Sequence, residues 1–467
     1  MASAPLLSAR CCQSHIFNFR NGELGPLGFF FHSSPSSSSS SSSTSSSAPS
    51  CSSFHHQRYG AGWNLCNLSG ILNIRKHQNL CGQAMSTSRG NIASPGGIVN
   101  AKDGPDHLLV LVHGLVASPS DWTYIEAELK RRLGRNFFIY VSSCNMYTKT
   151  LAGIDVAGKR LAAEVMQVVQ KTESLKRISF LAHSLGGLFV RYAIAVLYSP
   201  NSSSNGPSDD LANSTNTNLD TARPSRQGTI AGLEPINFIT LATPHLGVRG
   251  RKQLPFLFGV PILEKIAVPL APIVAGRTGS QLYLTDGKPD RPPLLLRMAS
   301  DSKDGKFISA LSAFRSRIIY ANVSYDHIVG WRTSSIRRET ELVQPSLQSL
   351  DGYKHIVNVE YCPPVSSQGP HFPPKAVKAK EAAQNAPSTQ NTVEYHEIME
   401  EEMIRGLQQL GWKKIDVSFH SAPWPFLAHN NIHVKNEWLN GSGVGVVTHV
   451  ADCLRQQESY SLITASL

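Results

Sequence analysis

The chain has 467 residues and a formal charge of +11, from 44 lysines and arginines against 33 aspartates and glutamates. An apolar fraction of 41% is enough to build a sizeable core, which excludes a wholly disordered chain. The basic residues are not concentrated on one helix or segment, so nothing indicates a nucleic-acid binder. The sequence holds no run of about 18 uninterrupted apolar residues, so no transmembrane helix is predicted.

Residues 1–100 are predicted to be a disordered N-terminal targeting segment. They contain six basic side chains and one acidic side chain, and a serine-rich tract runs from residue 33 to residue 53. Such a composition cannot bury a core, and it resembles the chloroplast transit peptide of a plant protein. The expected location is therefore the chloroplast. A plain disordered tail is the alternative, and translation from Met85 would leave a cytoplasmic enzyme.

From residue 101 to residue 467 the pattern predicts a mainly parallel α/β domain. Short apolar runs, each expected to be a buried strand, occupy residues 107–112, 137–141, 178–182, 236–241, 317–321 and 415–419. Helical patterns are found at residues 122–133, 156–169, 188–197 and 446–454. Strands that alternate with helices favour a central, mainly parallel sheet flanked by helices.

Three segments interrupt this alternation. The polar stretches 199–228 and 363–392 are predicted to be disordered insertions. Residues 246–296 are expected to form an apolar cap over the domain. Within this cap, prolines punctuate the apolar run 254–275, and we expect them to prevent a continuous helix there.

Ser184 is the candidate nucleophile. Residues 182–187, Ala-His-Ser-Leu-Gly-Gly, follow an apolar strand and precede a helical pattern, which is the context that a nucleophile elbow requires. Small residues two positions before and after the serine let the strand and the helix approach closely, although the first of them is Ala182 rather than glycine. The alternative is an ordinary strand-to-helix turn with a capping serine.

His113, Gly114 and Leu115 come at the end of the first predicted strand. Gly114 permits an unusual backbone conformation, so the next N–H can point into the site. The N–H groups of Leu115 and Leu185 are the candidate oxyanion hole, because such a hole uses the residue after the nucleophile and a loop after an early strand. His113, Gly114 and Gly186 are expected to support the elbow, His113 as a hydrogen-bonded structural histidine rather than as a base.

Three motifs carry a resemblance to a known family. Leu-Val-His-Gly-Leu (111–115), Ala-His-Ser-Leu-Gly-Gly (182–187) and Thr-Pro-His-Leu-Gly (243–247) resemble motifs of the α/β-hydrolase superfamily. Together with residues 276–286 and 320–326, they resemble a serine esterase family of lipase-like proteins from plants and fungi. The resemblance runs from residue 106 to the C-terminus, apart from the two polar insertions. It implies the α/β-hydrolase fold and a Ser–His–Asp hydrolase of ester bonds, with lipid esters as the expected substrates.

Asp326 is the candidate acid. A serine hydroxyl needs a histidine to take its proton and a carboxylate to orient that histidine. The chain order in this fold is serine, acid and histidine, so the acid should follow the strand 317–321. Asp326 lies there, and the resembling family carries its acid at this position. The preceding strand ends without a carboxylate, which supports Asp326. The alternatives are Asp301 and Asp304.

His429 is the candidate base, because the histidine should follow the last strand, 415–419. It comes about ten residues after that strand and matches the Ala-His-Asn pattern of the resembling family. His433 is the alternative, whereas His420 continues the strand too directly. His245 is expected to be structural, and His449, which lies in a helical pattern, is expected to pack or to lie at the surface.

These expectations describe a serine carboxylester hydrolase, a lipase that acts on acyl glycerolipids through an acyl-enzyme intermediate. The expected partner is an acyl-lipid or ester substrate, with peripheral membrane contact through the cap and no nucleic acid. No metal or cofactor is expected, because the chemistry needs none. Two alternatives stay open: an acyltransferase on the same fold, and a non-catalytic module that binds a hydrophobic ligand.

Overall fold

The computed structural model describes residues 104–201, 228–249, 261–288, 291–365 and 393–465. The predicted targeting segment 1–100 lies outside the described residues, as do most of the predicted insertions 199–228 and 363–392. Of the predicted cap 246–296, residues 250–260 and 289–290 also lie outside them.

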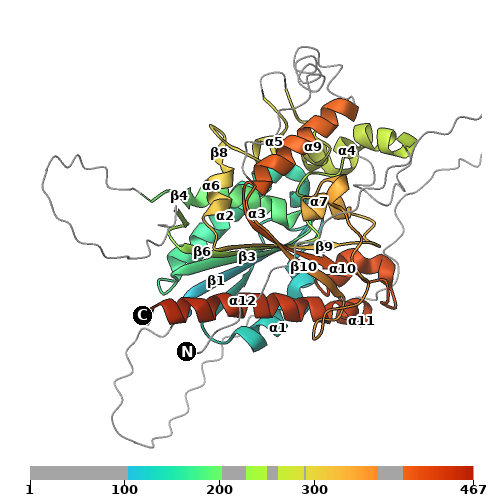
Figure 1. The fold of residues 1–467 in the computed structure, drawn as a ribbon. Coiled ribbons are helices and arrows are strands. Elements are labelled where there is room, and N and C mark those ends of the chain that lie inside the picture. Colours follow the sequence, from blue (N-terminus) through green and yellow to red (C-terminus); the bar gives the residue numbers. More distant parts are fainter. Residues whose placement is uncertain (1–103, 202–227, 250–260, 289–290, 366–392, 466–467) are drawn as a thin grey trace, which may run out of the picture. The chain divides into compact units, whose positions relative to one another are not determined.

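A seven-stranded sheet forms the centre of the described part of the chain (Figure 1). The spatial order of its strands is β10-β11-β9-β6-β3-β1-β2, and every neighbouring pair is parallel except β10 with β11. Parallel strands end at the same edge of a sheet, so the loops after several of them meet there. The strands are β1 (His107–Val112), β2 (Phe137–Val141), β3 (Arg177–His183), β6 (Glu234–Leu241), β9 (Ser316–Asn322), β10 (Ile356–Cys362) and β11 (Trp412–Val417).

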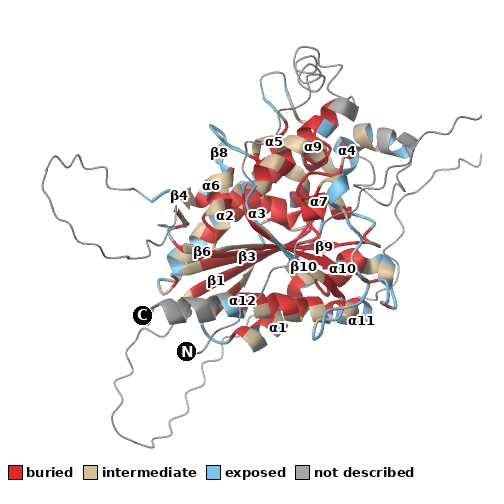
Figure 2. Cartoon of the chain, viewed as in Figure 1, coloured by how far each residue is buried: buried red, intermediate tan, exposed pale blue. Residues whose placement is uncertain are grey.

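Helices cover both faces of the sheet (Figures 1 and 2). α1 (Thr123–Leu133) and α12 (Val444–Ala465) lie on one face, and α2 (Ile154–Lys171) and α3 (Gly186–Leu197) lie on the other. β1 explains why both faces need cover, because successive side chains of a strand point to opposite sides. Leu108 and Val110 join the core beside α2 and α3, whereas Leu109 and Leu111 join the core beside α1 and α12.

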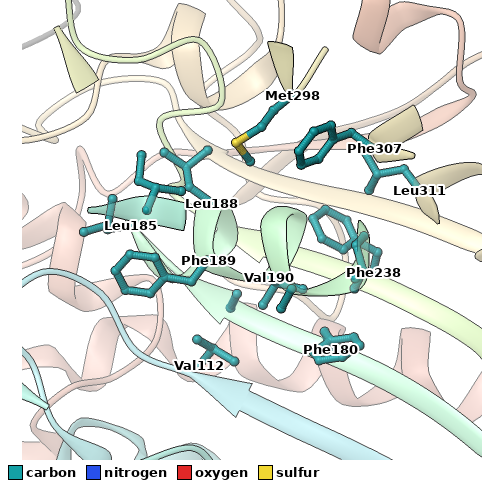
Figure 3. Packing of buried hydrophobic residues seen from close by; sticks show 14 of the residues in the cluster. Val112, Phe180, Leu185, Leu188, Phe189, Val190, Phe238, Met298, Phe307 and Leu311 are labelled. Atoms are coloured by element: carbon teal, nitrogen blue, oxygen red, sulfur yellow. The ribbon is translucent and has the colours of Figure 1, made fainter. Parts of the chain in front are cut away.

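α3 is packed into the first of these cores (Figure 3). Its residues Leu188, Phe189 and Val190 are fully buried and belong to the same hydrophobic cluster as Phe180 of β3 and Phe238 of β6. Burial of large aromatic and aliphatic side chains on several sides fixes the helix against the sheet. The turn that joins β3 to α3 therefore sits on a rigid support.

Shorter elements complete the described part of the chain. β4 (Tyr198–Ser199) pairs with β5 (Thr229–Ile230) on either side of residues 202–227, and β7 (Asp301–Ser302) pairs with β8 (Gly305–Lys306). The remaining helices are α4 (Pro261–Leu282), α5 (Leu294–Arg297), α6 (Phe307–Ser312), α7 (Trp331–Ser335), α9 (Val393–Gln408), α10 (Ala428–Asn431) and α11 (Glu437–Asn440). Single 3-10 turns lie at Pro119–Trp122, Tyr147–Ala152, Glu339–Glu341, Pro425–Leu427 and Gly441–Gly443.

The predicted class of fold, a mainly parallel sheet flanked by helices, is confirmed, but several elements differ from the sequence analysis. The antiparallel edge strand β10 was not predicted, and β11 begins and ends before the expected run 415–419. The expectation that prolines prevent a helix in the cap is wrong for α4, which contains Pro269 and Pro272 and is interrupted only at Ala275 and Gly276. Both prolines are exposed, so water can bond the carbonyl groups that lose their N–H partner. No helix among the described residues is both long and apolar enough to cross a membrane.

Candidate active site

Ser184 occupies the sharp turn between β3 and α3. Its backbone has a φ of 54°, which costs a residue with a side chain roughly 1–2 kcal/mol. Two hydrogen bonds hold this conformation: the Ser184 N–H donates to Leu241 O at 2.8 Å, and Thr243 Oγ1 donates to Ser184 O at 2.8 Å. Both partners belong to the end of β6 and the residues that follow it. The neighbouring strand therefore enforces the strained turn that presents the serine hydroxyl.

Gly186 and Gly114 allow the backbone to come close to this turn. A Cβ at Gly186 would lie 2.5 Å from Val112 O and 2.6 Å from His113 O, which no real side chain can do. A Cβ at Gly114 would lie 2.8 Å from Ser184 Cβ. The loop after β1, the serine and the start of α3 thus pack directly against one another.

The structure brings Ser184, His429 and Asp326 together from three separate parts of the chain. His429 lies on α10, beyond β11, and its Nε2 is 3.0 Å from Ser184 Oγ. Its Nδ1 is 3.0 Å from Asp326 Oδ2, in the loop after β9. Because the carboxylate can only accept, Nδ1 carries the proton and the Nε2 lone pair faces the serine hydroxyl. This tautomer can take the serine proton.

Asp326 is buried and held on both oxygens. Its Oδ1 accepts from the N–H groups of Ile328 and Val329, each at 2.9 Å, and Asn322 Nδ2 donates to its Oδ2 at 2.9 Å. Burial by itself raises the pKa of this carboxyl, but the charge of His429 and the hydrogen bonds from His429, Val329 and Asn322 lower the pKa below its ordinary value. The carboxylate is therefore ionised and fixed in orientation at neutral pH.

The two predicted oxyanion donors belong to the two segments that meet at Ser184. Leu185 follows it, and Leu115 follows Gly114, the residue whose missing Cβ makes room for the serine. In the part of the chain that the structure describes, the next N–H, that of Val116, donates to Thr150 Oγ1 at 3.0 Å, while those of Leu115 and Leu185 meet no acceptor. Two unoccupied donors beside a nucleophile could stabilise a developing oxyanion.

His113 does not contact the serine. Its Nδ1 lies 3.2 Å from Gly114 O, within its own loop. Burial lowers the pKa of the ring, although the Gly114 carbonyl and two distant carboxylates, Asp121 and Glu164, oppose that shift. His113 is placed as a structural histidine of the loop that precedes Leu115.

The alternative acids and bases lie away from Ser184 Oγ. Asp301 accepts from the N–H groups that begin α6, and Asp304 pairs with Arg291 and Arg297. The other histidines that the sequence analysis weighed have other neighbours: His420 contacts Ser418, His449 contacts Tyr320, His245 contacts Thr240, and His433 stacks on His183. Among the described residues, no group of three or more His, Cys, Asp or Glu side chains is arranged to hold a metal ion.

Sequence reasoning missed one residue of this site, His183. It directly precedes the serine, and its ring lies against His429. Its signal was present in the motif itself, because a histidine inside an otherwise apolar buried strand needs a hydrogen-bond partner. The sequence could not show that this partner lies 246 positions further along the chain.

The sheet order, the serine at a strand-to-helix turn, and an acid and a histidine after later strands define an α/β-hydrolase. Within this class, the family described as "Putative serine esterase (DUF676)" matches residues 102–336, half of the chain, and the protein belongs to this family.

Two curated relatives and two solved structures are similar to part of the chain. A protein of Schizosaccharomyces pombe described as a "Putative lipase" is 26% identical over 239 residues, 49% of this chain and 26% of the relative. The "Putative lipase ROG1" of Saccharomyces cerevisiae is 29% identical over 234 residues, 49% of this chain and 28% of the relative. The matched segment is thus less than a third of either relative. A lipase of Bacillus licheniformis in its propeptide form is similar in structure, with a TM-score of 0.28 and 16% identity over 48% of this chain and 36% of that chain. Lipase B of Aspergillus fumigatus is similar too, with a TM-score of 0.28 and 13% identity over 49% of this chain and 40% of that chain.

Proposed function

We propose that the protein is a serine carboxylester hydrolase, a lipase that acts on acyl glycerolipids. The observation that carries the proposal is the hydrogen-bonded chain from Ser184 Oγ through His429 to Asp326. A histidine that is oriented by an ionised carboxylate and faces a strained serine is the arrangement that activates a hydroxyl for attack on an ester.

Catalysis would proceed in two steps. Ser184 Oγ attacks the ester carbonyl while His429 Nε2 takes its proton, and the N–H groups of Leu115 and Leu185 stabilise the oxyanion. His429 returns the proton to the leaving alcohol, and the acyl group stays on Ser184. Water then attacks this acyl-enzyme, again giving its proton to His429, and the carboxylic acid leaves as the proton returns to Ser184. Asp326 stabilises the imidazolium in each step.

Exposed apolar side chains support a long acyl chain as part of the substrate. α4 exposes several aliphatic residues, with Ile273 at 79% and Val274 at 75% exposure. The loops that carry the site expose others: Leu115, Val116, Tyr325, Ile328, Trp424 and Phe426. Exposed apolar and aromatic residues of this kind suit the surface of a lipid aggregate, and we propose peripheral membrane contact through the cap.

The cap is also connected to the candidate oxyanion loop. Thr278 Oγ1 of α4 donates to Thr150 O at 2.7 Å, and Thr150 Oγ1 in turn accepts from the Val116 N–H. Thr150 is fully buried between them. A surface that binds the exposed side of α4 would therefore act close to the residues that stabilise the oxyanion.

The test is hydrolysis of p-nitrophenyl esters from short to long chain by the full chain and by Ser184→Ala. Loss of the nucleophile should lower kcat by about 10⁶-fold, to background. Ser312→Ala is the matched control and should keep full activity, because Ser312 lies on α6 and its hydroxyl donates to Ser309 O. Wild-type turnover that survives Ser184→Ala would refute the proposal.

Two further assays separate the alternatives. An acyltransferase would pass the acyl group to an added alcohol faster than to water, which product analysis detects. A non-catalytic binding module would turn over no ester and would not react with a labelled fluorophosphonate.

We also propose that residues 1–100 direct the protein to the chloroplast and that residues 101–467 form the hydrolase domain. The support is the serine-rich, acid-poor composition of the first segment. A fluorescent protein fused after residue 100 should enter chloroplasts, whereas the same fusion begun at Met85 should stay in the cytoplasm. Cytoplasmic fluorescence from both fusions would contradict this assignment.

A further inference from the structure

The residue before the nucleophile contacts the candidate base. The ring of His183 lies between two other imidazoles, with its centroid 4.7 Å from that of His429 and 3.8 Å from that of His433. Trp122 forms a T-shaped contact with His433, with the ring centroids 5.8 Å apart. All three histidines are buried, and His183 takes no part in the two-step reaction described above.

His183 is hydrogen-bonded to the backbone of His429 rather than to its ring. His183 Nε2 lies 2.8 Å from His429 O, and because a carbonyl only accepts, Nε2 carries the proton. The neighbouring carbonyls of α10, those of Ala428, Asn430 and Asn431, accept from backbone N–H groups instead. The side chain of His183 thus fills a position that the short helix leaves to a side-chain donor.

We propose that His183 is a positioning residue for His429, which holds the backbone of the base while Ser184 meets its ring. The inference rests on the proposed function, in which His429 transfers the proton. Adjacent residues of one strand end then contact the same histidine at two points, His429 O at 2.8 Å and His429 Nε2 at 3.0 Å. Both contacts come from the strand end that carries the nucleophile, so they align the base with it even though α10 is only four residues long.

The surroundings of His183 keep its ring neutral, as this role requires. Burial lowers the pKa of His183 well below its ordinary value, and the charges of His433, His429 and Lys435 act in the same direction against the opposing bond to His429 O. Lys435 itself is paired with Asp121 at 3.0 Å. A neutral ring adds no positive charge beside His429 when His429 takes the serine proton.

The experiment compares variants of the full chain on p-nitrophenyl butyrate, with kcat, KM and the unfolding midpoint as readouts. His183→Phe keeps an aromatic ring against His433 but has no donor, and His183→Gln keeps an N–H at similar reach. The control is His355→Phe, because His355 is also a buried histidine that bonds a backbone carbonyl, Ser418 O at 2.9 Å.

A displaced base should slow the chemistry without weakening binding of a small ester. We expect His183→Phe to lower kcat by about 10–100-fold with KM changed less than about twofold, since a displacement of about 1 Å can cost 10²-fold. His183→Gln should recover kcat to within about fivefold of wild type, because the donor is restored. His355→Phe should lower the unfolding midpoint and leave kcat of the folded protein unchanged.

Two results would overturn the inference while the proposed function stands: wild-type kcat in His183→Phe, or a loss in His183→Gln as large as in His183→Phe. Should Phe at position 183 prevent folding, His183→Met takes its place as a donor-free variant. An inactive wild type that equals Ser184→Ala would instead refute the proposed function, and the inference with it.

Discussion

Two buried aspartates on neighbouring strands show how differently one side chain can be used. Asp326 follows β9 and Asp416 lies on β11, and they are 4% and 2% exposed. Asp416 Oδ1 accepts from Arg337 at 2.7 Å and from Trp331 Nε1 at 2.8 Å, and its Oδ2 accepts from Asn358 at 3.1 Å. Asp326 accepts from backbone N–H groups, Asn322 and His429.

The difference is the partner, not the burial. Burial lowers the pKa of Arg337, but its bonds to Asp416 and Glu360 outweigh burial and raise the pKa above its ordinary value. Arg337 therefore stays charged, and this ion pair has no proton to transfer. His429 can change its charge and is itself bonded to a serine hydroxyl. Backbone strain does not separate the two regions, because φ is positive at Tyr325 beside Asp326 and also at Ile336 beside Arg337. The candidate site differs from the buried ion pair because its hydrogen-bonded chain ends on a serine hydroxyl whose proton the histidine can take.

Among the substitutions that test this comparison, the largest expected effect comes from Asp326→Asn. The amide can donate to His429 Nδ1, which would place the proton on Nε2, where it cannot accept from Ser184. We expect kcat to fall by about 10⁴-fold, while the nearly isosteric side chain keeps most of the packing. Ester turnover and the unfolding midpoint, measured on the same preparation, test this. A variant that keeps more than a tenth of the activity would remove Asp326 from the proposed mechanism.

Asp416→Asn is the matched change and should act in the opposite way. It leaves Arg337 buried with only the half-exposed Glu360, and removing one partner of a buried ion pair costs about 3–5 kcal/mol. The free energy of unfolding in guanidinium should drop by that amount, with kcat of the folded protein unchanged. A fall in kcat at equal stability would mean that this ion pair also shapes the site.

The sequence analysis named three of the residues that the structure brings together, but not the contacts between them. Ser184 could be identified because its strand, turn and helix are adjacent in the chain, and because the small residues around it let the strand and the helix approach closely. Asp326 and His429 could be proposed from chain order and from family motifs. Their 3.0 Å contacts depend on how three strand ends meet, which no local pattern encodes.

Elements that depend on distant partners were the ones missed. β10 is exposed over several residues, so it lacks the continuous apolar run of a central strand, and it exists because β11 pairs with it. His183 was passed over because its acceptor belongs to α10. Most of the six predicted strands, in contrast, are buried on both faces or nearly so, and burial is what an apolar run reports. The exception is the edge strand β2, which is buried at only two of its five positions.

Gly186→Ala should lower both kcat and stability, each by less than the corresponding aspartate substitution. The added Cβ would meet backbone oxygens of Val112 and His113, which cannot move aside as a side chain would. Overpacking of this kind costs about 1–3 kcal/mol, and the shifted turn should lower kcat as well. Gly441→Ala is the control, because a Cβ there has nothing within 4 Å. Equal stability of the two variants would contradict the close approach at Gly186.

As the pH falls, buried histidines outside the site should lower the stability of the protein before the site carboxylate does. Burial and the charge of Lys413 lower the pKa of His449 to about 4, against Asp452, whereas an unfolded chain titrates near 6.5. Between pH 6.5 and about 4 the unfolded state therefore takes up a proton that the folded state does not, and stability falls by about 1.4 kcal/mol per pH unit for this group. Asp326 has a lowered pKa, so its contribution is present above about pH 4 and is lost only below it.

His449→Gln should accordingly flatten the pH dependence of unfolding in that window by about one proton, and Asp326→Asn should leave its slope unchanged. Unfolding free energies at pH 7, 6, 5 and 4.5 measure both. If Asp326→Asn also flattened this window, the carboxyl would titrate above pH 4 in the folded protein. Asp326 would then lose its charge in part of this pH window, and the comparison with Asp416 would rest on the geometry of the two carboxylates alone.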